Sequence, residues 1–164
     1  MATGNSLVSW SPAANQPPAA NFAVIDTTNS QLFLGFNDTT IQSALFVGVM
    51  PRNYTFLGLK VTVYWAAASA TSGDVKWGGS FERLQDGIDL ITADSFAAEQ
   101  TVVSTAPGVA GTIKYATITF TDGAQIDSIQ VGEAFRFKLR RVASDAADTM
   151  TGDGRIVRVE IRET

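Results

Sequence analysis

Apolar and polar residues alternate with a period of two along much of this chain. The clearest series spans residues 57–65, where the apolar positions are Leu57, Leu59, Val61, Val63 and Trp65. Lys60, Thr62 and Tyr64 lie between them. Because side chains of an extended strand point alternately to opposite faces, this pattern predicts a strand with one face in the core. We expect it to be a central strand.

The last third of the chain repeats the alternation twice. Apolar side chains alternate with charged ones over residues 135–140 and again over residues 157–162. The intervening residues 144–154 are small, acidic and rich in turn-forming types. We therefore predict two strands, each with one buried and one solvated face, joined by a loop.

Shorter apolar segments, separated by turn-forming residues, complete the pattern. They occupy residues 22–27, 31–36, 43–50, 76–85, 100–105 and 115–121. The nearly continuous apolar run at 43–50 indicates a strand covered on both faces or an edge that faces a partner. Two glycines within 76–85 indicate a bulge or the close approach of another backbone. Residues 92–99 could form a single helical turn with Thr92 or Ser95 as its cap.

About nine short strands at this spacing predict an all-β fold, an antiparallel β-sandwich. The interval 86–100 is too long for a hairpin, which favours jelly-roll connections over a meander. In a jelly roll the last two strands belong to opposite sheets, whereas in a meander they pair directly.

Residues 1–21 differ from the rest because they hold three prolines and no charged side chain. Proline lacks a backbone donor and favours extended conformations, which argues against a ladder strand. We therefore predict an extended Pro-rich N-terminal arm, 1–21, followed by a jelly-roll β-sandwich domain, 22–164. Leu7, Val8 and Trp10 would anchor the arm on a neighbouring subunit, and a loose terminus is the alternative.

Composition narrows the chemistry that the chain can carry out. It has neither cysteine nor histidine, which removes disulfides, thiolate nucleophiles, the usual zinc ligands and imidazole bases. Paired carboxylates, as in glycosidases, need neither residue. The composition nevertheless favours a non-enzymatic protein without a cofactor.

Charge and hydropathy argue against two kinds of partner. A formal net charge of −4 and a pI of about 4.7 disfavour binding to nucleic-acid phosphates. No apolar run approaches the length that crosses a bilayer, and the N-terminal residues lack the features of a secretory signal. We therefore expect no nucleic-acid or membrane partner, and synthesis in a cytoplasm.

The C-terminal third carries a resemblance to a known group of proteins. Residues 132–153 (GEAFRFKLRRVASDAADTMTGD) and 158–163 (RVEIRE) resemble virion proteins of tailed bacteriophages. The similar proteins are β-sandwich modules of capsid decoration, or cement, proteins and of tail and head-fibre appendages. The resemblance implies a structural role in a particle, often as a homotrimer, and it transfers no catalytic residue.

Three aspartates of the 144–154 loop are candidates for calcium binding. Asp145, Asp148 and Asp153 could supply the oxygen ligands that this ion prefers. The spacing of an EF-hand loop is absent, however, and loop aspartates commonly close turns and accept backbone hydrogen bonds. We therefore prefer the turn interpretation.

Aromatic and acidic residues offer two further candidates. A sugar-stacking platform could be built from Trp77, Tyr64, Trp65, Tyr54 and Tyr115. Alternation points Trp65 into the core, opposite to Tyr64, so core packing is the preferred interpretation. The pairs Glu82 with Asp86, and Asp89 with Asp94, could act as glycosidase acids, but nothing in the sequence fixes their separation.

The main functional hypothesis is a capsid cement protein on the virion surface. It would bind the major capsid protein as a homotrimer and stabilise the shell by bridging neighbouring subunits. The candidate contact residues are Leu7, Val8, Trp10, Leu45, Phe46 and Val47. The alternative is a receptor- or glycan-binding module of a tail or head appendage, with its site in loops.

Overall fold

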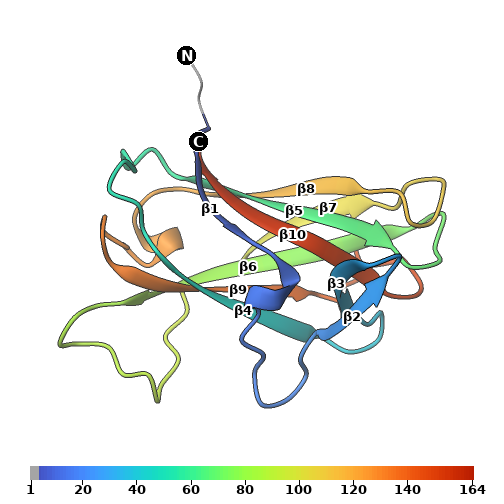
Figure 1. Cartoon of the computed structure of the whole chain (residues 1–164), viewed down its shortest axis with the longest axis horizontal. Helices are drawn as coiled ribbons and strands as arrows, with labels where there is room; N and C mark the ends of the chain where they lie inside the picture. The colour runs from blue at the N-terminus through green and yellow to red at the C-terminus, as the bar shows by residue number, and fades with distance from the viewer. Residues whose placement is uncertain (1–3) are drawn as a thin grey trace.

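The computed structural model describes residues 4–164, which fold into two stacked antiparallel sheets (Figure 1). The six-stranded sheet, sheet A, consists of β2 (Val24–Thr28), β3 (Gln31–Phe36), β10 (Gly154–Glu163), β5 (Leu59–Ala67) and β8 (Lys114–Phe120) in that order, with β1 (Ser6–Trp10) paired to β10. The four-stranded sheet, sheet B, has the order β4 (Gln42–Val49), β9 (Ala134–Arg141), β6 (Asp74–Leu84) and β7 (Gln100–Thr105). This arrangement confirms the antiparallel β-sandwich.

The connections are those of a jelly roll. The consecutive strands β9 and β10 lie in different sheets, as predicted for this topology. Likewise β4 and β5 follow one another in the chain but belong to different sheets. The loop 142–153 crosses from sheet B to sheet A and so separates two strands that share the same alternating pattern.

The core lies between the sheets and is rich in aromatic rings. The predicted central strand is β5, from which Leu59, Val61, Val63 and Trp65 point inward and are fully buried. Across the interface, β6 and β9 contribute Phe81 and other phenylalanines, with the ring of Phe81 4.9 Å from that of Phe137. Each such buried side chain stabilises the fold by roughly 1.5–3 kcal/mol.

The N-terminal residues correct the sequence prediction of an arm without a ladder strand. Residues Ser6–Trp10 form β1, in which Val8 pairs with Ile161 and Trp10 with Val159 of β10. The prolines follow this strand and do not interrupt it, because Pro12 begins a 3-10 turn, η1 (Pro12–Ala14). The expected arm is therefore part of the sandwich through its first strand.

Trp10 is packed inside the protein's own core. Its side chain is 7% exposed and its ring stacks on Phe46 at 5.2 Å. Its indole Nε1 donates a hydrogen bond to the carbonyl of Val47 at 3.1 Å. Both rings are therefore used by this fold, and a contact of Trp10 or Phe46 with a partner stays a prediction.

The helical turn expected at 92–99 is also wrong, because sheet B takes up the backbone donors of this segment. The amide of Ser95 donates to Glu82 Oε1 at 2.5 Å, and that of Ala97 donates to the carbonyl of Phe81 at 2.8 Å. The described residues contain two three-residue 3-10 turns, η1 and η2 (Ala124–Ile126). Neither is long and apolar enough to cross a membrane.

Candidate functional site

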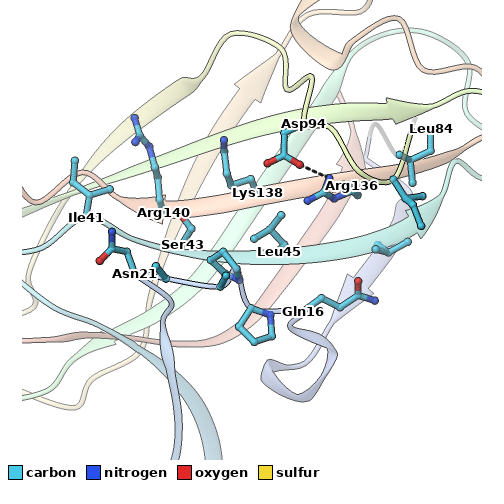
Figure 2. Close-up of a pocket in the computed structure, with 16 residues that line it drawn as sticks. Gln16, Asn21, Ile41, Ser43, Leu45, Leu84, Asp94, Arg136, Lys138 and Arg140 are labelled. Atoms are coloured by element: carbon cyan, nitrogen blue, oxygen red, sulfur yellow. Dashed lines mark hydrogen bonds and ion pairs between the residues drawn. The ribbon is translucent and has the colours of Figure 1, made fainter. Parts of the chain in front are cut away.

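A groove of about 810 Å³ lies on the outer face of sheet B, above β4 and β9 (Figure 2). Its floor comes from these two strands and its walls from two loops, 15–23 and 85–99. Both loops protrude from the same side of the sandwich in Figure 1, blue and yellow-green respectively. The site is therefore built by chain segments that are far apart in the sequence.

The floor carries a row of three basic side chains beside a less polar row. Strand β9 turns Phe135, Phe137 and Leu139 into the core, so the residues between them face outward. The register pairs Arg136 with Val47, Lys138 with Leu45 and Arg140 with Ser43. One half of the floor is thus cationic, and the other half, on β4, is largely apolar.

The first wall runs along the free edge of β4. The amide of Gln16 donates to the carbonyl of Leu45 at 2.7 Å, and the amide of Leu45 donates to Asn15 Oδ1 at 3.0 Å. Further along, the amide of Ser43 donates to the carbonyl of Asn21 at 2.9 Å. These bonds cover an edge that would otherwise be open to pairing. Residues 17–20, between the two attachment points, form the wall.

The second wall is held over β6 by a close approach at Gly78. A Cβ at this position would lie 2.5 Å from the carboxyl carbon of Glu99, so only glycine leaves room for that side chain. Glu99 in turn accepts hydrogen bonds from Nε and Nη2 of Arg140, the latter at 2.9 Å. The sequence predicted a bulge or the close approach of another backbone at the paired glycines, whereas the structure places side chains there.

Carboxylates neutralise the two arginines of the floor. The ion pair with Glu99 raises the pKa of Arg140 above its usual value. Arg136 Nη1 donates to Glu82 Oε2 at 2.7 Å and to Asp94 Oδ1 at 2.8 Å. Glu82 is buried, whereas Asp94 is exposed at the groove. The Arg136 end of the floor therefore carries an excess of negative charge.

Lys138, between the two arginines, lacks such a partner. Within residues 4–164 its Nζ forms no ion pair or hydrogen bond. It lies 4.1 Å from the centre of the Phe96 ring, which attracts the ammonium without neutralising it. Phe96 also contacts Arg136, with the guanidinium carbon 5.0 Å from the ring centre. The ring thereby orders the middle of the cationic row.

The five aromatic residues that the sequence suggested as a sugar-stacking platform lie in two separate regions. Trp65, Trp77 and Tyr54 are buried in the core, as the packing interpretation requires. Tyr64 and Tyr115 instead lie on the outer face of sheet A, with ring centres 4.3 Å apart and Tyr115 64% exposed. None of these five side chains lines the groove, where the nearby aromatic ring is that of Phe96.

The loop aspartates are used within the fold, and the amide of Ala147 donates to Asp145 Oδ1 at 2.9 Å, a turn contact of the kind the sequence predicted. Asp148 pairs with the buried Arg141 at 2.7 Å, and Asp145 pairs with Lys76 at 2.6 Å, which lowers the pKa of Asp145. Asp153 accepts the amide of Ala68 through its backbone carbonyl. Within residues 4–164, no group of three or more acidic side chains is arranged to hold a metal ion.

The proposed acid pairs do not face one another across the groove. Asp89 Oδ2 accepts the amide of Gln85 at 2.6 Å and closes a local turn. Glu82 and Asp94, which the sequence assigned to different pairs, share Arg136. The structure gives Asp86 no role in this site.

The remaining contact candidates are distributed over two regions. Leu7 and Val8 are half-buried against the core through β1. Leu45 and Val47 lie on the groove floor. Their contact with another subunit stays a prediction. The alternation of β4 could have placed Leu45 and Val47 on one outer face, but the loops that cover this face left no signal in the sequence.

Comparison with known proteins identifies related folds. No protein-family model and no curated protein sequence matches this chain. The CBM22-1 xylan-binding domain of Xyn10C from Paenibacillus barcinonensis is similar in structure, with a TM-score of 0.53 and 11% identity over 98% of this chain and 96% of that domain. The xylan-binding module CBM15 has a TM-score of 0.50 and 12% identity over 96% and 97%. The likeness shows a shared β-sandwich fold.

Proposed function

We propose that this protein is a non-catalytic module that binds a glycan chain in the groove over sheet B. The observation that carries the proposal is the groove itself, which is open, lies on a rigid sheet and is bounded by two loops. The similar fold of two xylan-binding domains, aligned over nearly their whole length, supports it. Function still has to be argued from the site, because one fold can serve many functions.

The chemistry of the groove fits a sugar chain. Guanidinium, amide and hydroxyl groups of Arg140, Asn21 and Ser43 offer donors and acceptors to sugar hydroxyls. Val47, which is 39% exposed, offers apolar surface to the C–H faces of the rings. The three acidic side chains near the floor are engaged by arginines, Glu82 and Asp94 by Arg136 and Glu99 by Arg140, so none stands free as a hydrolytic pair would require. The site therefore favours binding over cleavage.

A groove-filling variant tests the proposal. Ser43→Trp places a large ring on the floor without entering the core, and Thr119→Trp places the same ring on the exposed outer face of sheet A. We expect Ser43→Trp to abolish binding of plant-type oligosaccharides, measured by calorimetry, and Thr119→Trp to bind as the unmodified protein does. Equal binding by both variants, or no binding of any oligosaccharide by the unmodified protein, would contradict the proposal.

A second candidate function is the virion role that the sequence resemblance implies, which stays a prediction. One observation favours an association between copies of the chain. Strand β2 forms an edge of sheet A, and its residues Val24 and Ile25 are half-exposed. Apolar side chains on a free edge are suited to pairing with another chain. Mass measurement in solution, combined with incubation with purified capsids, tests this role. We expect a trimer, and a monomer that does not bind to capsids would contradict it.

A further inference from the structure

We infer that the groove selects a glycan bearing an isolated uronate, whose carboxylate binds the ammonium of Lys138. This inference rests on the proposed function, since it names the class of sugar that the same site prefers. It follows from the distribution of charge along the floor, from the packing of the Phe96 ring against Lys138 and from the position of the excess negative charge.

The charge distribution leaves one cation for a ligand. Arg140 is held by both oxygens of Glu99, and Arg136 faces two carboxylates. Lys138 faces Phe96 and the apolar Leu45. A positive charge that is partly withdrawn from water and lacks a counter-charge attracts an anion more strongly than a fully solvated one. The centre of the groove is therefore complementary to a single carboxylate.

The composition of the lining makes this charge important for recognition. Sugar-binding sites commonly use stacking on aromatic rings, but the ring at this groove, Phe96, packs against Lys138 and Arg136. Binding of a neutral chain would depend on hydrogen bonds and on modest apolar contacts. A charge-assisted hydrogen bond is the stronger interaction that the site can offer. We expect it to distinguish acidic from neutral chains.

The neighbouring charges limit how many carboxylates the groove accepts. Side chains two residues apart on a strand are separated by roughly 7 Å. On one side of Lys138 lies Arg136 with the exposed carboxylate of Asp94, which repels a second anion. On the other side Glu99 already occupies Arg140. A chain with isolated uronates is therefore preferred over a contiguous polyuronate.

Calorimetric titration with matched ligands tests the inference. The probes are a xylo-oligosaccharide carrying one glucuronate, its carboxyl-reduced neutral form, and an oligogalacturonate of similar length. We expect the first to bind about 10- to 100-fold more tightly than the second, which is the usual effect of a hydrogen bond to a charged group. The difference should shrink at high salt, and oligogalacturonate should bind more weakly than the single-uronate chain.

Variants assign the effect to one side chain. Lys138→Met keeps much of the apolar stem and removes the charge, so it should bind the acidic and neutral forms equally. Lys138→Arg should retain the preference. Lys60→Met, the same change on the outer face of sheet A, is the matched control and should behave as the unmodified protein does.

The outcomes separate the two levels of the proposal. Equal binding of the acidic and neutral forms by the unmodified protein would overturn the inference and leave glycan binding intact. Tighter binding of oligogalacturonate would also overturn it, because the repulsion from Asp94 would then be absent. If no oligosaccharide binds, the proposed function and the inference both fail.

Discussion

The outer faces of the two sheets arise from the same sequence pattern but form different contacts. On sheet A outward residues form hydrogen bonds with one another, as when the hydroxyl of Tyr64 donates to Glu160 at 2.8 Å. On sheet B the outward residues of β9 interact with a distant loop through Glu99 and Asp94. Alternation thus produces two polar faces, and the long connections turn that of sheet B into a groove of about 810 Å³.

The largest expected effect concerns an arginine that ties a long loop to sheet B. Arg141 is fully buried, and its guanidinium donates to Asp148 and to the carbonyls of Met150 and Gly152. Arg141→Met would leave a buried carboxylate without its cation, and we expect a loss of about 3–5 kcal/mol in the free energy of unfolding. Urea unfolding followed by tryptophan fluorescence measures it.

The matched control for this variant lies on sheet A. Arg155 of β10 covers the ring of Phe33, with 4.5 Å between the guanidinium carbon and the ring centre. Because this contact is at the surface, Arg155→Met should cost only about 0.5–1 kcal/mol. Similar losses for both variants would contradict the structural role of Arg141 in holding the loop 142–153 to sheet B.

Adjacent glycines of β6 provide an intermediate effect. A Cβ at Gly79 would lie 2.8 Å from Cζ of Phe137 inside the core, so Gly79→Ala should cost about 1–3 kcal/mol through overpacking. A Cβ at Gly78 displaces only the flexible carboxylate of Glu99, and losing that half-exposed pair costs about 0–1 kcal/mol. Thermal unfolding of the two variants compares them. A larger loss for Gly78→Ala would contradict the assignment of inner and outer faces.

A smaller effect is expected from pH. Hydrogen bonds from Arg83, Lys76 and Ser6 lower the pKa values of Glu133, Asp145 and Glu160 respectively. A carboxyl group whose pKa is lower in the folded than in the unfolded chain stabilises the fold at a pH above its unfolded pKa. This contribution to the free energy of unfolding is lost as pH falls. Stability should therefore decline below the ordinary values of 4.5 and 3.8 for Glu and Asp.

The alkaline side behaves in the opposite sense. Burial and the hydrogen bond to Asp122 raise the pKa of Tyr54 above its ordinary value of 10.0. The unfolded chain then loses this proton first, so stability should fall as pH rises above 10.0. With no histidine in the chain, the unfolding free energy should be nearly constant between about pH 6 and pH 9. Denaturant unfolding across this range measures the free energy of unfolding. A steep change near pH 6.5 would contradict the expectation that no group of this protein titrates strongly there.

The sequence predicted those parts of the fold that depend on local alternation. The inward face of β5 and the outward cations of β9 follow from the side-chain period. The separation of β9 from β10 was predicted correctly, but the prediction that the interval 86–100 is too long for a hairpin was wrong, because β6 and β7 on either side of it pair directly. The strand β1 was missed because the prolines that follow it dominated the composition of residues 1–21. Its pairing depends on β10, which lies about 150 residues away.

The groove could not be predicted because contacts between distant segments create it. The pattern at 92–99 was compatible with a helical turn, but Glu82 and the carbonyl of Phe81 bind its amides. Asn15 and Asn21 cover the edge of β4 through contacts that no local pattern records. The cation at Lys138 was visible in the sequence, whereas its lack of a carboxylate partner was not.

The most direct test of glycan binding in the groove is to map a bound sugar onto the two faces of the sandwich. Backbone amide chemical shifts can be recorded while the glucuronate-bearing xylo-oligosaccharide is added. We expect saturable shifts on β4, β9 and the loops 15–23 and 85–99. Shifts confined to the Tyr64 and Tyr115 face of sheet A, or no shifts at all, would contradict it.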